Sequence, residues 1–165
     1  MLKSDYATQN CSIARALEVV GERWTLLIVR ELLMKPWRFS DLVRRLDVSK
    51  NVLASRLTKL VEMGVVDTET YDANHDWNSY RLTPMGRELF PAVNALMAWG
   101  DKYFAPDGPP VVFMHTCDEP AGNTLVCQSC GEELTADNFH PRLGPGFHKA
   151  TPESASAPRR RPAKG

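Results

Sequence analysis

Two helical runs separated by a very short turn constrain the fold more than any other feature of this chain. Over residues 40–63 a short amphipathic run, DLVRRL, is followed after three residues by a longer one, KNVLASRLTKLVEM. Ser40 and Ser49 stand just before these runs, where a hydroxyl can accept hydrogen bonds from the first free N–H groups of a helix. Leucines recur in the longer run at the spacing of one helix face. The pattern predicts a helix-turn-helix, with Gly64 closing its second helix.

Helical spacing also predicts two helices before this unit, over 12–21 and 24–36, and one long helix after it, over 84–104. A proline inside the last of these should kink or break it. Between the helix-turn-helix and the long last helix, the helical spacing gives way to the two-residue period of a β-strand. Residues 65–72 and 78–83 predict two strands that a polar loop, ANHDW, joins into a β-hairpin. The predicted fold is therefore mainly α with a small β-hairpin wing, which is a winged helix-turn-helix.

Composition divides the chain into parts. We expect a winged helix-turn-helix domain over 1–104, a linker (APDGPP) over 105–110, a small Cys/His segment over 111–140 and a flexible, basic, Pro-rich tail over 141–165. No apolar run approaches the ~20 residues of a membrane-spanning helix. The first residues, MLKSDYATQN, lack the apolar stretch of an export signal. We therefore expect a cytoplasmic protein without membrane contact.

Charge is balanced overall but unevenly distributed. The chain has 20 Lys and Arg against 20 Asp and Glu, which argues against a generic polyanion binder. Residues 35–60, however, carry seven positive charges against two negative ones. A basic patch confined to one segment is typical of a local phosphate-binding surface. Since a helix fits the major groove of B-DNA, the second helix of the helix-turn-helix is predicted to bind double-stranded DNA.

The candidate DNA contacts divide by chemistry. The amide of Asn51 can pair with the edge of an adenine, while the hydroxyls of Ser55 and Thr58 discriminate less between bases. The arginines and lysines, and the free N–H groups where the first of the two helices begins, suit phosphates. The wing, with Asn74 among its polar residues, would lie against the minor groove. The predicted contacts are Arg38, Ser40, Arg44, Arg45, Ser49, Lys50, Asn51, Ser55, Arg56, Thr58, Lys59, His75 and Arg81.

Three stretches resemble the HxlR family of bacterial transcriptional regulators. They are CSIARALEVVGERWTLLIVRELLMKPWRFSDLVRRL, VSKNVLASRLTKLVEMGVVDTETY and YRLTPMGRELFPAVNALMAWG, and together they cover about residues 11–100. The resemblance implies a homodimer in which the first and last helices pair across a two-fold axis. It also implies two recognition helices on a pseudo-palindromic operator, usually with repression. The chain departs from the family pattern at Gly21-Glu22, where two glycines are common, and in its wing, where a proline is common.

Two physical arguments favour the dimer independently of the resemblance. Two half-sites multiply the limited specificity of one short recognition helix. The last predicted helix, with Trp99, Tyr103 and Phe104, also has more apolar surface than one small core requires. The alternative is that these aromatics complete the core of the single chain.

We therefore predict a sequence-specific transcriptional regulator and not an enzyme. Its DNA binding is expected to respond to an oxidant or a small molecule. The alternative is a winged-helix adaptor that binds proteins without specific DNA binding, and the basic segment 35–60 argues against it.

Cys11 is a candidate redox trigger. It begins the first predicted helix, near free backbone N–H groups and one turn before Arg15, and both effects favour the thiolate. Four cysteines without an export signal indicate a reducing compartment, where thiols bind metal or do redox chemistry. Members of the family that the chain resembles commonly have a cysteine here, and some are thiol-based sensors. The alternative is a small apolar residue buried at a dimer contact.

A second group of ligating residues follows the linker in the pattern H-x-C-x9-C-x2-C. CQSCG is the tight-turn knuckle of zinc ribbons, with Gly131 permitting the turn. The segment has little core of its own, so a structural Zn²⁺ would explain how it folds. His140 is a rival fourth ligand, and a metal-free thiol cluster or a disulfide within CQSC is the alternative. The predicted zinc ligands are His115, Cys117, Cys127 and Cys130.

Overall fold

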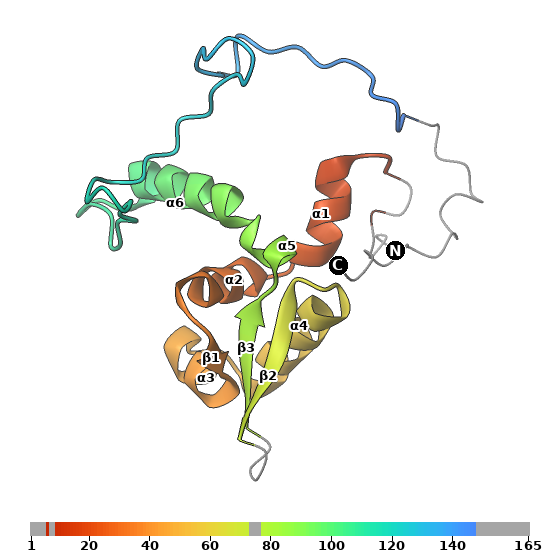
Figure 1. Ribbon diagram of the computed structural model, residues 1–165, viewed down its shortest axis with the longest axis vertical. Helices are drawn as coiled ribbons and strands as arrows, with labels where there is room; N and C mark the ends of the chain where they lie inside the picture. The colour runs from red at the N-terminus through yellow and green to blue at the C-terminus, as the bar shows by residue number, and fades with distance from the viewer. Residues whose placement is uncertain (1–5, 7–8, 73–76, 148–165) are drawn as a thin grey trace. The chain divides into compact units, whose positions relative to one another are not determined.

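The computed structural model describes residues 6, 9–72 and 77–147 and divides the chain into two compact units (Figure 1). The first extends to Phe90, and the second, Pro91–Gly146, contains the Cys/His segment and nearly all of α6 (Phe90–Phe104). The elements of the first unit are α1 (Ser12–Val20), α2 (Thr25–Met34), β1 (Trp37–Arg38), α3 (Phe39–Leu46), α4 (Lys50–Glu62), β2 (Val66–Asp72), β3 (Trp77–Leu82) and α5 (Pro84–Arg87).

The structure contains the predicted helix-turn-helix, formed by α3 and α4, and the predicted hairpin, formed by β2 and β3. Asp47 takes a left-handed backbone conformation (φ 49°), and its N–H donates to the carbonyl of Val43, which turns the chain between α3 and α4. Ser49 caps α4 by accepting a hydrogen bond from the N–H of Val52 at 3.4 Å. After α4, Gly64 has a φ of +74°, a conformation that glycine adopts without steric cost. The chain then enters β2.

The sheet has a strand that the sequence did not predict. β1 pairs antiparallel with β3, with Trp37 opposite Tyr80, so the strand order is β1-β3-β2. Because this extended pair runs directly into α3, the predicted capping role of Ser40 is wrong. Arg38 occupies the N-cap position without a side-chain cap, and Ser40 lies exposed inside the first turn.

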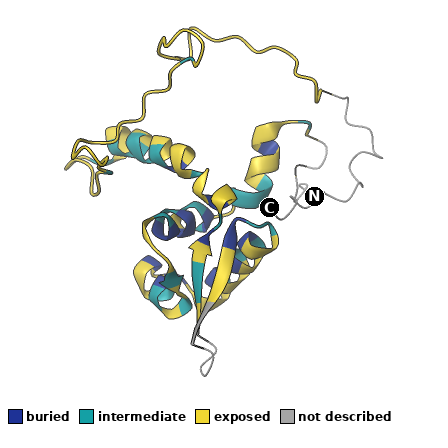
Figure 2. Ribbon diagram, viewed as in Figure 1, coloured by how far each residue is buried: buried dark blue, intermediate teal, exposed yellow. Residues whose placement is uncertain are grey.

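The core of the first unit lies between the sheet and helices α2, α3 and α4 (Figure 2). Leu53, Leu57 and Leu60 of α4 are fully buried, as their spacing predicted. On α2 and α3 the fully buried apolar residues are Ile28, Val29, Leu32 and Leu42.

Several apolar residues of the predicted helices lie at the surface. Val61 at the end of α4 and Leu27 on α2 are both exposed. On α1 only Ala14 is buried, and Ile13 is 71% exposed. Helical spacing identified the apolar face of α1, but the residues that the structure describes leave most of that face uncovered.

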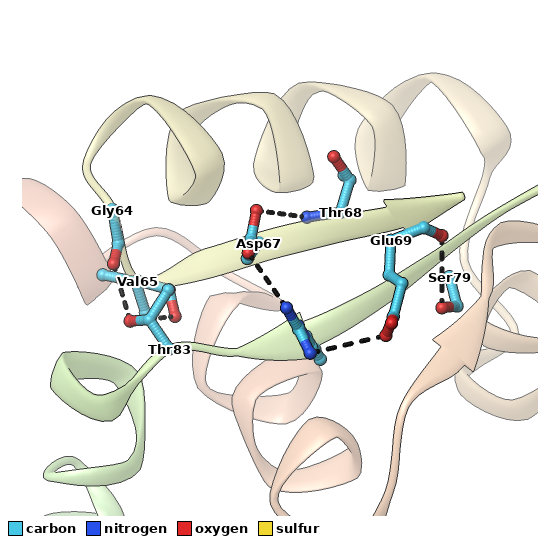
Figure 3. A network of polar contacts seen from close by, with 8 residues as sticks. Gly64, Val65, Asp67, Thr68, Glu69, Ser79 and Thr83 are labelled. Atoms are coloured by element: carbon cyan, nitrogen blue, oxygen red, sulfur yellow. Dashed lines mark hydrogen bonds and ion pairs between the residues drawn. The ribbon is translucent and has the colours of Figure 1, made fainter. Parts of the chain in front are cut away.

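A threonine joins the end of α4, the start of β2 and the start of α5 (Figure 3). The hydroxyl of Thr83 donates to the carbonyl of Gly64 at 2.7 Å, with the carbonyl of Val65 at 3.2 Å, and accepts from the N–H of Gly86 at 3.1 Å. Thr83 therefore caps α5 and ties the base of the wing to the end of α4.

The predicted last helix is broken, as expected from its proline. α5 ends at Arg87 and α6 begins at Phe90, which places Pro91 in the first turn, where a missing N–H costs little. None of the helices formed by the described residues has the length and apolar character needed to cross a membrane.

Gly86 is buried where α5 approaches the chain leading into β2. A Cβ at this position would lie 2.2 Å from the carbonyl oxygen of Val65, and backbone cannot move aside as a side chain can. We expect Gly86→Ala to lower the free energy of unfolding by roughly 2–3 kcal/mol, as overpacking does. Urea unfolding measures this change, and the neighbouring exposed-site variant Arg87→Ala should stay within ~0.5 kcal/mol of the unsubstituted protein. Equal stability of the two variants would contradict the close contact.

Candidate nucleic-acid interface

One face of α4 is free of core contacts and carries the predicted base-reading groups. The side chains of Lys50, Asn51, Ser55 and Thr58 are exposed, while that of Lys59 is half-buried. The buried leucines lie on the opposite face. Amide, hydroxyl and ammonium groups are therefore presented together on one rigid helix, the arrangement that reading a major groove requires.

The two arginines of α3 are exposed but have acidic partners. Arg44 forms an ion pair with Asp41, one turn earlier on the same helix. The Nε of Arg45 donates to the Oε2 of Glu31 at 3.1 Å. Both arginine side chains remain more than half exposed. The exposed pair of Arg44 with Asp41 contributes little stability, so a phosphate can compete for that guanidinium. The partner of Arg45 is buried, so its pair is costlier to break.

Glu31 positions α3 although the sequence analysis gave it no role. It is only 4% exposed, and Arg30 and Arg45 satisfy its two carboxylate oxygens. Its backbone carbonyl accepts a hydrogen bond from the indole N–H of Trp37 at 3.0 Å. A single residue of α2 thus holds both β1 and α3. A carboxylate at an inward position of a helix was the signal that could have revealed it, because buried carboxylates are paired.

Arg56 is predicted to contact phosphate, but the structure gives it partners within the domain. Its guanidinium forms a 2.8 Å ion pair with Glu22, and its Nε donates to the carbonyl of Arg23 at 3.3 Å. Its side chain is only 22% exposed. Arg56 therefore ties α4 to the turn before α2 and sets the position of the recognition helix.

The wing carries a smaller group of charges (Figure 3). Arg81 on β3 lies 3.4 Å from the carboxylate oxygens of Asp67 and of Glu69, both on β2. It therefore cross-links the hairpin. Arg38 is exposed in β1, at the edge of the sheet away from β2. Asn74 and His75 lie outside the described residues.

Comparison with known proteins agrees with this geometry. A family described as HxlR-like helix-turn-helix matches residues 19–108. The chain belongs to this family. The HTH-type transcriptional regulator Rv3095 of Mycobacterium tuberculosis is 50% identical over 138 residues, which cover 82% of this chain and 87% of that protein. YdeP of Bacillus subtilis, also an HTH-type transcriptional regulator, is 28% identical over 104 residues, 60% of this chain and 80% of that one.

Solved structures of similar fold extend the comparison. The crystal structure of PA1607, a candidate transcription factor, has a TM-score of 0.76 and 34% identity, and the match covers 84% of this chain and 99% of that one. The reduced form of the redox regulator HypR has a TM-score of 0.53 and 26% identity, covering 56% of this chain and 92% of that one. This HxlR-like protein is thus a transcriptional regulator with a helix-turn-helix DNA-binding domain.

Cys11 of this HxlR-like regulator is exposed and occupies the N-cap position of α1, as predicted. The sulfur forms no capping hydrogen bond. The nearby backbone N–H groups of Ala14 and Ile13, and the charge of Arg15, nevertheless lower the pKa of the thiol below its usual value. The start of α1 thus favours the thiolate of Cys11, and burial of Cys11 at a dimer contact stays the alternative.

The four predicted zinc ligands of this regulator lie in two pairs. His115 Nδ1 is 3.1 Å from the sulfur of Cys117. In the second pair, the backbone N–H groups of Cys130 and Ser129 lower the pKa of the Cys127 thiol. Among the residues that the structure describes, no three His, Cys, Asp or Glu side chains come close enough together to share a metal ion. The two ligands of each pair are neighbours, but the described structure does not bring the two pairs together into one metal site.

Proposed function

We propose that this HxlR-like regulator is a sequence-specific repressor that acts in the cytoplasm as a homodimer on a pseudo-palindromic operator. The observation that carries the proposal is the two-sided character of α4. Its leucines are buried among the other helices, and its amide, hydroxyl and ammonium groups are exposed together on the opposite face. The same recognition helix from a second protomer would read the other half-site one helical turn away.

The contacts divide between reading and anchoring. Asn51 and Ser55 suit base edges, because their short side chains carry hydrogen-bonding groups close to the helix. Lys50, Lys59 and Arg44 suit phosphates, which set the register without reading sequence. Arg45 and Arg56 act mainly through their acidic partners, by holding α3 and α4 in place.

The triple variant Asn51→Ala, Ser55→Ala, Lys59→Ala tests this placement. All three groups lie outside the core, so the fold should survive while operator affinity falls at least ~100-fold. Fluorescence anisotropy with the promoter fragment adjacent to the gene measures the affinity, and far-UV circular dichroism checks the fold. Arg87→Gln removes a cation from α5 and is the matched control, which should bind normally.

The same titration separates the roles of single residues. Lys59→Gln alone should lower the slope of log affinity against log salt by ~1, because one phosphate contact is lost. A correctly folded triple variant with unchanged operator affinity would place the interface elsewhere. Absence of selective binding to any genomic fragment would favour the adaptor role.

The homodimer is supported by apolar surface that the chain leaves open. On α6 the ring centroid of Trp99 lies 5.7 Å from that of Tyr103 and 5.1 Å from that of Phe104, and each of these residues is more than half exposed. Ile13 on α1 is similarly open. Exposed apolar surface of this kind on each helix is typical of protein–protein contact. We place the two-fold contact on α1 and α6.

Trp99→Glu should therefore weaken dimerisation by ~100-fold or more, as the loss of a central aromatic anchor does. Sedimentation velocity over a range of concentrations measures the change. Lys102→Gln, which alters charge on the same helix and leaves the aromatic rings in place, should remain dimeric. A Trp99→Glu protein that sediments as the unsubstituted one does would remove α6 from the interface.

A thiol response is the finer part of the proposal. Cys11 is accessible, its thiolate is favoured by the start of α1, and HypR, which shares the fold, is a redox regulator. Oxidation would join the Cys11 sulfur to a second thiol as a disulfide, with loss of two protons and two electrons to the oxidant. Because α1 belongs to the proposed dimer contact, such a bond would alter the spacing of the two recognition helices.

Diamide, which accepts those electrons, should lower the operator affinity of the unsubstituted regulator at least ~10-fold, and the Cys11→Ser variant should keep its affinity. In a variant that retains only Cys11, alkylation by iodoacetamide should remain faster at pH 7 than that of a cysteine in a short peptide. The sign follows from the lowered pKa, which leaves more thiolate at neutral pH. Equal loss of affinity in both proteins would exclude Cys11 as the trigger.

A further inference from the structure

The Cys/His segment contains the same turn twice. In the first turn the N–H of Ala121 donates to the carbonyl of Phe113 at 2.8 Å. In the second, the N–H of Leu134 donates to the carbonyl of Leu125 at 2.7 Å. Each bond closes a tight loop, and the first loop is one residue shorter than the second. The predicted ligands lie inside these two loops.

The inner hydrogen bonds of the two turns also correspond. The N–H of His115 donates to the carbonyl of Glu119, and that of Cys127 donates to the carbonyl of Glu132, each at 2.8 Å. The carbonyls of these two ligands in turn accept bonds from the N–H groups of Asp118, at 3.0 Å, and of Gly131, at 2.8 Å. The first ligand of each turn is therefore held in the same way.

The second ligand of each turn is followed by a residue with a left-handed backbone. Asp118 follows Cys117 with a φ of 64°, and Gly131 follows Cys130 with a φ of 75°. A non-glycine residue rarely adopts this conformation. The HTC turn is thus a knuckle in its own right, although its sequence spacing is irregular. This repetition goes beyond the CQSCG motif that the sequence alone reveals.

The Cys/His segment buries almost no side chains that could stabilise its two turns. Between residues 106 and 147 every residue is exposed except Phe113 and Cys127, which are half-buried. Residues 105–140 carry six acidic and no basic side chains. Two ordered turns without a core, in an acidic segment, need a cross-link, and a cation bound by thiolates supplies one.

We propose that the two turns bind one structural Zn²⁺ ion between them. Each turn contributes one pair of ligands, and the ion joins the pairs into a closed tetrahedral site of three thiolates and one imidazole. The proposal does not depend on DNA binding or on the response of Cys11. The ligands are His115 and Cys117 from the first turn and Cys127 and Cys130 from the second.

The geometry of the first pair fits this role. Two atoms bound to one tetrahedral zinc, a nitrogen and a sulfur, lie about 3.5 Å apart. His115 Nδ1 and the sulfur of Cys117 are 3.1 Å apart, so a small opening of this pair would admit the ion. Since the described residues do not bring a third ligand to either pair, metal binding must draw the two turns together. The nine residues between Cys117 and Cys127 supply the necessary length of chain.

Metal content of the full-length protein tests the proposal directly. Protein purified under reducing conditions should contain about one zinc per chain by elemental analysis. Co²⁺ added to chelator-treated protein should bind with the same stoichiometry and give the visible absorption of a tetrahedral, thiolate-bound ion. Protein without stoichiometric zinc that also fails to show this spectrum would overturn the site.

Variants identify the ligands. Cys117→Ser and Cys127→Ser lie on different turns, and each should weaken Co²⁺ binding by more than the ~10–100-fold that a lost second-shell partner costs. His115→Ala should bind less tightly, while His140→Ala and Cys11→Ser should bind as the unsubstituted protein does. Full Co²⁺ affinity in Cys117→Ser would show that the two turns do not share an ion. Loss of binding in His140→Ala with retention in His115→Ala would overturn the assignment of His115.

Limited proteolysis supplies a readout that is independent of the spectrum. Removing the metal with a chelator should speed cleavage within 111–140 and leave the cleavage rate within 12–90 unchanged, because the first unit has its own core. Identical cleavage of that segment with and without metal would contradict a structural role for the ion. The variant Cys127→Ser should be cleaved at the rapid rate under both conditions.

Discussion

Burial of one leucine stripe determines what α4 can do. Leu53, Leu57 and Leu60 are fully buried, and each contributes roughly 1.5–3 kcal/mol by leaving water. Rotation of the helix about its axis would expose all three, so the polar side has one permitted direction. The ion pair of Arg56 with Glu22 adds a second fixed point. Core packing thus sets the direction in which the exposed polar groups of α4 point.

Among the seven cations in residues 35–60, Arg44, Arg45 and Arg56 have a carboxylate partner. The pair of Arg44 with Asp41 is exposed and contributes only ~0–1 kcal/mol, so Arg44 can exchange its partner for a phosphate at small cost. Glu31 differs because it is buried, and loss of its arginine partners would leave a carboxylate without water. Arg44 is therefore the cation best suited to phosphate, while Arg45 serves mainly to satisfy Glu31.

Local rules account for the elements that the sequence predicted. Helix caps, a left-handed turn and a change of period placed α4 and the hairpin, and the proline correctly predicted the break before α6. β1 was not predicted because two residues have no periodicity, and only pairing with Tyr80 and Ser79 makes Trp37 and Arg38 a strand. That pairing in turn displaced the start of α3. The roles of Glu22 and Glu31 depend on residues 34 and 14 positions away, which no local pattern contains.

The apolar helix faces and the Cys/His turns share one property, which is that they bury little surface within a single copy. The core of the first unit closes around α4, but the apolar faces of α1 and α6 and the two turns of the Cys/His segment bury little of themselves. Folding must offset the entropy of ordering these residues, and buried surface within one chain does not do so. Under the two proposals, a second copy would bury the apolar faces of the helices and a Zn²⁺ ion would cross-link the turns. Because the two components are chemically different, dimerisation and the structure of the Cys/His segment can be lost independently of each other.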